Sequence, residues 1–548
     1  MLSDMGRKTA GLIAVAVFAS LCATSAVAHN ASVVEGIVKN SSGQPVTGAF
    51  VKLKNAEKRL TFMVISQAQG KYTADRLPAG KYSVQGVGGG FQSDWSAAVT
   101  VADGATAKHD VSLTKRQAAT LAPAWPGRMP EESVANAAWP DGAGKQIAMQ
   151  RCTACHEAGR TLARRQDKEG WHETVEGMRE NMKDMGMPDL SEQEANTLVD
   201  YFASNFPPMA QPDENSRLPQ TLMTGQALKY RVVQYDLVNG SAETHDIAVA
   251  PDGTGWSGQR MGGKLSKFDP ETYEYTEFDP PMLKAAKARM GNAQIGKDGV
   301  LWLPEPNDRR WLSFNTKTAQ WASHPVPTTV RGSAGGNSMA IANDGTVWNT
   351  GPGLAKSYNP TTKEWNYFDS PTAKTSKLNP GGYGIAIAGD GKIWFAMNNV
   401  DKLARVDPVS GKVDEFNIPV QGIAYPRRMT NDADGNIWVS LWSAGKLMKV
   451  DYKTAEMSTF DPPSGSTSGV YSVDVDEKSN LIWMTLHRAD KIARFNPKTL
   501  EWVEFPLPQA ETDVRRVELD PSNPNRLWWA TVGNFGGSAR MGFVELLP

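Results

Sequence analysis

Two cysteines and a histidine form the motif with the most specific chemistry in this chain of 548 residues. They stand in the run Cys152-Thr-Ala-Cys155-His156. At this spacing two thiols reach the two vinyl groups of one porphyrin, and the next residue supplies an imidazole to the iron. A thioredoxin-like redox pair would need a βαβ context, and half a zinc site would need a further Cys or His pair nearby. We therefore expect one covalent haem c, bound by Cys152, Cys155 and His156.

The sixth iron ligand is expected a short way downstream, among Met178, Met182, Met185, Met187 and His172. A resemblance to the small cytochrome subunits of periplasmic dehydrogenases rests on Arg164-Arg165, Trp171, Val175 and Met178. In those subunits the Met seven residues after the Trp looks like the axial thioether, which makes Met178 the first choice. Met182 lies one helical turn further, and Met187 before Pro188 resembles the Met-Pro loop of other small cytochromes. His172 would give a bis-His site, but thioether ligation is commoner in cytochromes of this type.

Three helices are predicted around the motif. Residues 144–150 form a helix that leads into it, and residues 168–185 show helical spacing. Residues 190–206 contain a capping box, Ser191-Glu-Gln-Glu194, at the start of an apolar run. We expect a small all-α cytochrome c domain at 141–208, between a Pro/Ala-rich linker at 116–140 and a second linker at 209–226.

The first residues have the pattern of an export signal. Arg7 and Lys8 precede an apolar run over residues 11–22, and Ala26-Val27-Ala28 offers a cleavage site. The run is shorter than the roughly 20 residues of a membrane span, so an uncleaved anchor is the weaker alternative. Residues 1–28 are therefore expected to be a signal peptide, and the protein periplasmic or secreted. No integral membrane segment is expected after cleavage.

Charge and composition limit the partners and the fold. Lys plus Arg (58) nearly cancels Asp plus Glu (59), so the chain lacks the broad basic field that nucleic-acid binding needs. The expected partner is a redox protein or a small-molecule substrate. Gly 50, Pro 34 and Trp 17 favour many short strands, and the predicted fold class is mostly β and multidomain.

Residues 30–115 are predicted to form a small antiparallel β-sandwich. Apolar and polar residues alternate between turn signals, as in Val33-Val-Glu-Gly-Ile-Val38 and Ala49-Phe-Val-Lys-Leu53. Gln69-Gly-Lys-Tyr72 and Leu77-Pro-Ala-Gly-Lys-Tyr-Ser-Val84 resemble the carboxypeptidase regulatory-like domain. That resemblance implies a domain that organises other domains or binds partners, and we expect no chemistry here.

Repetition dominates residues 227–548. Seven tryptophans recur at steps of 44 to 46 residues: Trp256, Trp302, Trp348, Trp394, Trp438, Trp483 and Trp528. The fullest copies read Asp390-Gly-Lys-Ile-Trp394 and Asp434-Gly-Asn-Ile-Trp438. Each copy supplies an inner strand, an Asp-Gly hairpin, a Trp-bearing strand and two outer strands, which predicts a seven-bladed β-propeller with the tryptophans packed between blades. Residues 230–237 are expected to supply the outermost strand of the last blade and close the ring.

The repeat also resembles the streptogramin lyase (virginiamycin B lyase) family, through its Asp-Gly-x-Ile-Trp and Lys-Leu/Ile-x-Arg elements. The resemblance implies a metal-assisted elimination that needs Glu and His on loops at one mouth of the ring. Glu305 stands three residues after a repeat Trp, but Asn307 occupies the place of the expected His. His487 in the sixth copy has Leu486 in the Glu position. The catalytic set of the family therefore does not transfer, although Glu305 and His487 remain candidates.

Seven residues about eleven positions before the tryptophans are expected at one mouth of the channel: His245, Asn292, Asn337, Tyr383, Arg427, Tyr471 and Arg515. His245 could act as a base or ligand, and Arg427 with Arg515 could hold a carboxylate or phosphate. The alternative is that these groups satisfy one another and channel water.

Three functions remain open on this basis. The first is an exported c-type haem electron-transfer protein, a periplasmic oxidoreductase whose propeller binds or oxidises a substrate or docks a redox partner. The second is a streptogramin lyase-like C–O lyase or hydrolase. The third is a binding scaffold that offers the sandwich and the propeller as surfaces.

Overall fold

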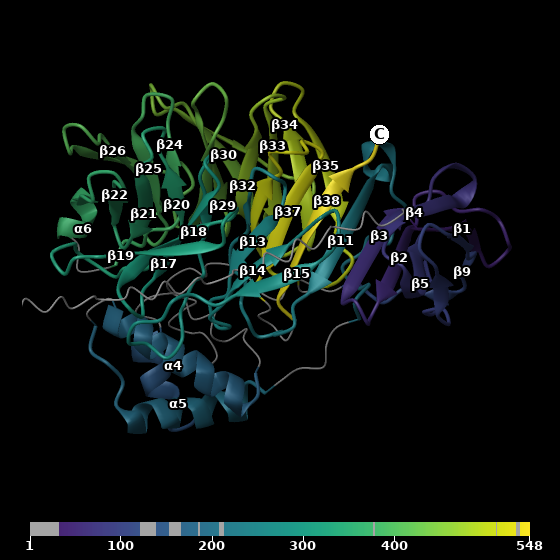
Figure 1. The fold of residues 1–548 in the computed structure, drawn as a ribbon, viewed down its shortest axis with the longest axis horizontal. Coiled ribbons are helices and arrows are strands. Elements are labelled where there is room, and N and C mark those ends of the chain that lie inside the picture. The colour runs from purple at the N-terminus through teal and green to yellow at the C-terminus, as the bar shows by residue number, and fades with distance from the viewer. Residues whose placement is uncertain are drawn as a thin grey trace, which may run out of the picture.

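The computed structural model describes residues 32–120, 139–152, 166–184, 187–207, 213–375, 379–422, 424–510, 512–532 and 538–548. They form a β-sandwich, a small helical module and a propeller, and the fold is mostly β (Figure 1). The expected signal peptide at 1–28, the residues Cys155 and His156, Arg164-Arg165 and Met185 lie outside the described residues. Within the ranges given above, no helix is long and apolar enough to cross a membrane.

The sandwich has two sheets. One has the order β4-β1-β8, with β9 also on β1, and the other contains β10-β6-β5-β2-β3, with β7 on β5. The strands are β1 (Ser32–Asn40), β2 (Phe50–Asn55), β3 (Leu60–Ile65), β4 (Lys71–Leu77), β5 (Gly80–Gly88), β6 (Phe91–Gln92), β7 (Val99–Val101), β8 (Thr106–Lys108), β9 (Val111–Leu113) and β10 (Lys115–Arg116). The expectation of a purely antiparallel sandwich is wrong, because β1 pairs parallel with β8 and β9. Parallel pairing needs a crossover, and the long chain between β1 and β8 provides one.

The helical module contains α2 (Lys145–Ile147), a π-helical turn (Ala148–Cys152), α4 (Lys168–Asp184) and α5 (Glu192–Asn205). The capping box before α5 is confirmed, since the Ser191 hydroxyl accepts from the Glu194 amide and the Glu194 carboxylate accepts from the Ser191 amide. The helices are joined by an aromatic core in which Trp171 stacks on Phe202 with ring centroids 4.7 Å apart. In Figure 1 the module lies beneath one face of the propeller.

Six blades of the propeller are four-stranded antiparallel sheets. Their strands are β12 (Ala248–Val249), β13 (Gly255–Gly258), β14 (Leu265–Phe268), β15 (Tyr275–Phe278); β16 (Gln294–Ile295), β17 (Val300–Glu305), β18 (Arg310–Asn315), β19 (Gln320–Pro325); β20 (Met339–Ile341), β21 (Val347–Gly351), β22 (Leu354–Tyr358), β23 (Trp365–Asp369); β24 (Ile385–Ile387), β25 (Ile393–Met397), β26 (Lys402–Val406), β27 (Val413–Asn417); β28 (Pro426–Asn431), β29 (Ile437–Leu441), β30 (Lys446–Val450), β31 (Met457–Phe460); and β32 (Val470–Asp476), β33 (Leu481–Leu486), β34 (Lys491–Asn496), β35 (Glu501–Pro506). Short helical segments occur at Ala68–Gly70, Gly225–Leu228, Pro371–Thr375 (α6) and Ser466–Ser468.

The seventh blade combines both ends of the propeller sequence. Strands β36 (Val514–Leu519), β37 (Arg526–Thr531) and β38 (Arg540–Leu546) are completed by β11 (Tyr230–Asp236), which pairs antiparallel with β38. The predicted closing strand is thereby confirmed. The outer edge of β11 pairs in turn with β3 of the sandwich, so one continuous sheet runs through both domains. This pairing covers the one edge that ring closure would leave open on that blade.

All seven repeat tryptophans are buried, as predicted. Each packs against the next blade: Trp256, for example, lies in one cluster with Leu301 and Leu303, and Trp528 of the last blade lies in one with Phe268 of the first. The tryptophans therefore hold the ring together and leave the ends of the inner strands to form the channel mouths.

Candidate functional site at the propeller mouth

A tyrosine pair lies at the centre of the channel mouth. The Tyr383 hydroxyl is 3.2 Å from His245 Nε2 and also forms a hydrogen bond with the Tyr471 hydroxyl. Burial raises the pKa of Tyr383 to about 12. Burial acts in the same direction on Tyr471, but the charges of Arg427 and two further arginines outweigh it and lower the Tyr471 pKa. The two phenols thus differ in acidity while they share one hydrogen bond.

A histidine–aspartate pair lies on each side of the tyrosines. His245 Nδ1 is 2.7 Å from Asp246 Oδ1, and His487 Nε2 is 2.5 Å from Asp513 Oδ1. Burial lowers the pKa of His245 to about 3, and burial also lowers that of His487 although Asp513 opposes it. Both imidazoles are therefore neutral at neutral pH, and each donates its ring proton to its aspartate. This leaves His245 Nε2 as an acceptor that faces the Tyr383 hydroxyl.

The arginines of the mouth are already engaged. Arg515 donates to both carboxylate oxygens of Asp513, at 2.8 and 3.0 Å, and Arg428 pairs with Asp246. The Arg427 guanidinium lies over four aromatic rings, at centroid distances of 4.4, 4.4, 4.9 and 5.1 Å, which belong to Tyr383, Tyr425, Trp442 and Tyr471. The prediction that Arg427 and Arg515 together receive an anion is therefore not supported by their contacts.

The structure thus brings together five of the predicted mouth residues, His245, Tyr383, Arg427, Tyr471 and Arg515, and adds His487. Their catalytic roles stay predictions. Asn292 and Asn337 instead donate to carbonyl oxygens of the following blade, Gly336 and Gly382. These two asparagines agree with the alternative interpretation, in which the polar groups at the mouth form hydrogen bonds within the protein.

Glu305 does not join this cluster. Its buried carboxylate accepts from the amides of Asn307 and Asp308, at 3.0 and 3.1 Å, and pairs with Arg310 at 3.1 Å. It holds the turn between β17 and β18. These contacts give Glu305 a structural role here, away from the cluster, and a catalytic role for Glu305 stays a prediction.

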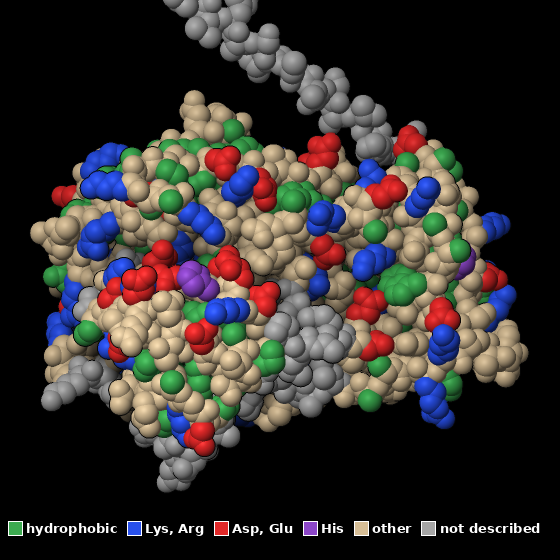
Figure 2. Space-filling model, turned by 90° about the horizontal axis from the view of Figure 1, so that it is seen from below, with side chains coloured by type: hydrophobic (Ala, Val, Ile, Leu, Met, Phe, Trp, Pro, Cys, Tyr) green, Lys and Arg blue, Asp and Glu red, His purple; other side chains and the backbone are tan. Residues whose placement is uncertain are grey.

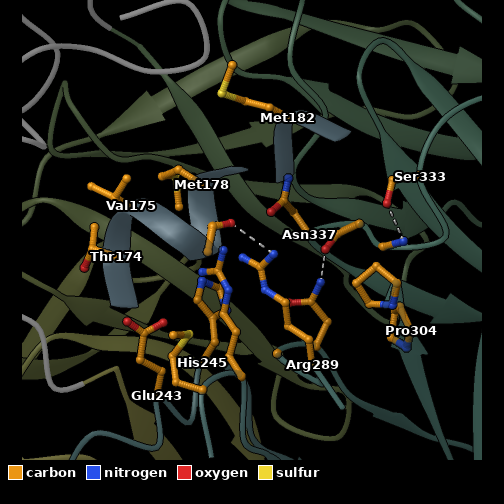
Figure 3. A pocket seen from close by; sticks show the side chains of 18 of the residues that line it. Thr174, Val175, Met178, Met182, Glu243, His245, Arg289, Pro304, Ser333 and Asn337 are labelled. Carbon is orange, nitrogen blue, oxygen red and sulfur yellow. Dashed lines mark hydrogen bonds between the residues drawn. The ribbon is translucent and has the colours of Figure 1, made fainter. Parts of the chain in front are cut away.

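A cavity of about 330 Å³ separates the mouth from the helical module. Figure 3 shows Thr174, Val175 and Met178 of α4 on one side, with Glu243, His245 and Arg289 of the propeller nearby. The helical wall is mainly apolar: Trp171, Val175, Met178, Met182, Leu190, Leu198 and Phe202. The propeller wall is mainly polar: Glu243, His245, Arg260, Arg289, Asn292 and Asn337. A volume of this size is at the lower end of the range for small-molecule sites.

The candidates for iron ligation lie differently around this cavity. Cys152 lines it, at the end of the π-helical turn, and so do Met178 and Met182. Met187 packs against the core of the module and does not line the cavity, and His172 is exposed on α4. Met178 and Met182 thus border the cavity, and Met187 and His172 do not; which of the four would bind iron stays a prediction.

Sequence reasoning missed several residues of the site. Asp246 and Arg428 stand directly beside two predicted residues, so a search of the neighbours would have found them. Asp513 lies two positions before Arg515, so the same search would have found it. Arg260 and Arg289 had no such signal, because they lie on connections whose sequence does not recur from blade to blade.

Fold and site together define the class of this protein: a seven-bladed propeller extended by a β-sandwich, with a helical module over one channel mouth. Residues 293–535 match the virginiamycin B lyase family, and residues 33–114 match the carboxypeptidase regulatory-like domain, as the sequence predicts. The comparison with curated proteins finds no match.

Two solved structures show the same propeller fold. The chain is 18% identical to a streptogramin B lyase, with a TM-score of 0.51 over 59% of this chain and 100% of that one. It is also 18% identical to a catalytically inactive virginiamycin B lyase from Staphylococcus aureus with quinupristin, with a TM-score of 0.50 over 58% of this chain and 100% of that one. At this identity the likeness establishes the fold of the propeller alone.

Proposed function

We propose that this is an exported haem c protein whose helical module presents the porphyrin to the propeller mouth. The single observation that supports the proposal is the cavity between them, which Cys152 borders on one side and His245 on the other. An electron carrier placed there would exchange electrons with a molecule bound at the mouth or with a redox protein docked over it.

The residues around the cavity fit the group. Cys152 supplies one thiol of the attachment motif, and Met178 and Met182 present thioethers to the same space. Trp171 and Phe202, both buried, give the apolar surroundings that a macrocycle requires. Bound in this way, the iron would supply one-electron transfer.

The mouth residues would handle protons. Oxidation of an organic molecule releases protons together with electrons, and Nε2 of the neutral His245 offers a weak base for one of them, because burial lowers the pKa of His245 to about 3. Asp246 would then stabilise the resulting imidazolium at Nδ1. Because the Tyr383 hydroxyl donates to Nε2 and accepts from Tyr471, a proton released at Tyr471 would pass through Tyr383 to Nε2 along existing hydrogen bonds.

The protein produced with its leader in a host with a haem-attachment system tests the proposal. We expect the intact mass to exceed that of the polypeptide by one porphyrin, and a reduced-minus-oxidised spectrum typical of a c-type haem. Cys152→Ala should lower the yield of attached porphyrin strongly, whereas Met187→Leu, outside the cavity, should leave the spectrum unchanged. Met178→Leu should change it if Met178 is the ligand. An unmodified polypeptide would overturn the proposal.

The spectrum of the same protein also separates a substrate site from a docking site. Under anaerobic conditions an organic substrate of the mouth should reduce the haem, and His245→Gln should slow this reduction. If only a small redox protein reduces it, the propeller acts as a dock.

A second candidate is lyase-like or hydrolase chemistry at the propeller mouth. The comparisons concern the propeller and the sandwich, so they support this candidate more directly than the first. His487 is the residue to test, because it lies buried in the mouth beside Asp513. Turnover that is lost in His487→Ala and is indifferent to the oxidation state of the haem would establish it. Glu305→Ala is uninformative for this purpose, since it removes the partner of Arg310.

A further inference from the structure

The wall of the cavity carries more positive than negative charge. Of the described residues that line the cavity, four are cationic and two are carboxylates: Arg151, Arg260, Arg289 and Lys356 against Glu173 and Glu243. The outer surface on this side of the molecule shows acidic and basic side chains interspersed (Figure 2). The cationic excess is therefore a local property of the cavity, as expected where an anion binds.

Arg260 is the cation with the fewest partners. Its side chain forms no hydrogen bond or ion pair with any residue in the described part of the chain, although it lines the cavity beside Arg289. Burial lowers the pKa of Arg260 to about 10, and the charge of Arg289 adds to this effect, while Glu243 opposes it. Arg260 is half-buried, and a partly desolvated guanidinium that its neighbour repels is stabilised by an added anion.

Arg289 is placed across from the helical module. It is buried, and its Nη1 lies 3.4 Å from the carbonyl oxygen of Gly177 in α4. The apolar side chains Trp171, Val175 and Phe202 form the opposite wall. A ligand that satisfies both walls has an apolar body and at least one carboxylate.

We propose that Arg260 and Arg289 form a carboxylate-binding site in the wall of this cavity. The carboxylate has two possible sources, a propionate of the porphyrin or a free organic acid that binds beside it. Binding of a free organic acid does not require the haem. Only the oxidation of that acid would rest on the proposed function.

Isothermal titration of the exported protein with benzoate tests the free acid, since benzoate joins an apolar ring to one carboxylate. We expect saturable binding of one molecule per chain, weakened about tenfold or more in Arg260→Gln, because a charge-assisted hydrogen bond is lost. Lys287→Gln is the matched control: it removes one positive charge from the loop of Arg289, but its exposed side chain does not line the cavity. The control should bind benzoate as the unaltered protein does. Arg289→Lys keeps the charge and should retain more affinity than Arg289→Gln, and a thermal melt verifies that each variant is folded.

If the carboxylate at the site is a propionate of the porphyrin, the measurements give different results. Benzoate then fails to bind, but the midpoint of a reductive titration followed by the haem spectrum shifts in Arg260→Gln and not in Lys287→Gln. The inference is overturned if benzoate does not bind and Arg260→Gln matches Lys287→Gln in every measurement. Intact mass distinguishes this failure from that of the proposed function. If the polypeptide carries no porphyrin but still binds benzoate through Arg260, the proposed function fails and the carboxylate-binding site stands.

Discussion

The two ends of the inner propeller strands are built on different principles. At the end that faces the helical module, the blades contribute different residue types. Four of them form one cluster: His245, Tyr383, Arg427 and Arg515. At the opposite end, a cavity of about 1010 Å³ is lined by repeated hairpins that include Asp344, Gly391 and Asp434.

The repeated end is constrained by the backbone. The hairpin glycines have positive φ angles of 78° to 86°, at Gly253, Gly299, Gly345, Gly391 and Gly435. A residue with a side chain adopts this conformation only at a cost, so the turn fixes the sequence. The other end also has a recurring position with positive φ, two residues before the mouth residues, but different residue types occupy it: Glu243, Gly381, Tyr425, Gly469 and Asp513. There the backbone conformation does not fix the residue type, and the residues differ from blade to blade. Chemistry in this ring is therefore expected where the repeat is broken, and stability where it is kept.

The largest predicted effect tests the part that both ends share, the packing between blades. Trp394 is fully buried, and its indole stacks on Phe416 with centroids 5.1 Å apart. Trp394→Ala should lower the free energy of unfolding by about 3 to 5 kcal/mol, because it leaves a cavity between two blades. Tyr367→Ala, on an outer strand and 43% exposed, should change it by less than about 0.5 kcal/mol. Urea denaturation measures both, and equal effects would mean that the tryptophans do not hold the ring.

The second prediction concerns a carboxylate at the repeated end. Burial raises the pKa of Glu518 to about 7, and Asp474 adds to this, although Arg516 opposes it. Between the ordinary pKa and this value, the folded state holds a proton that the unfolded state has released. The free energy of unfolding therefore falls as pH rises from about 4.5 to about 7, by up to about 3 kcal/mol.

Glu518→Gln removes this dependence and should be more stable than the unaltered protein above pH 7. Glu477→Gln is the control, since Glu477 lines the same cavity but is exposed. Urea midpoints at several pH values measure the effect, and a Glu518→Gln profile parallel to that of the unaltered protein would contradict the assignment.

Much of the fold could be predicted because its signals are local. The spacing of the tryptophans, the Asp-Gly turns and the box from Ser191 to Glu194 each depend on residues a few positions apart, and the structure confirms all three. The joined sheet between β3 and β11 could not be predicted in the same way. It pairs Val64 with Arg231, and no local pattern specifies a contact over that separation.

The site was predictable only in part for the same reason. Counting back from each tryptophan found one residue per blade, which located the mouth. It could not reveal that Asp513 neutralises Arg515, or that Glu305 is held by Arg310, because these pairings depend on turns of individual blades. Arg260, on a connection outside the repeat, was invisible to any periodic search.

The third prediction is an opposite pH dependence of stability at the end of the propeller that faces the helical module. Burial lowers the pKa of His245 to about 3, so the unfolded state binds a proton that the folded state excludes once pH falls below about 6.5. The free energy of unfolding should therefore decrease by about 2 kcal/mol from this residue between pH 6.5 and pH 5. His245→Gln should flatten this limb of the profile, whereas His172→Gln, at an exposed position of α4, should not. A loss of stability that is unchanged in His245→Gln would show that the histidine is not desolvated.

The smallest effect returns to the hairpins. Gly391 has a φ of 78°, and an added Cβ would meet no atom within 4 Å, so Gly391→Ala tests the backbone conformation alone. It should cost about 1 kcal/mol, the strain of an alanine in the left-handed region. Gly435→Ala differs because its Cβ would lie 2.5 Å from Gly389 Cα, and it should cost more. Urea denaturation of both variants measures how much each substitution lowers the free energy of unfolding. A neutral Gly391→Ala would show that the turn does not demand glycine, and the repeated end would then owe its sequence to something other than backbone geometry.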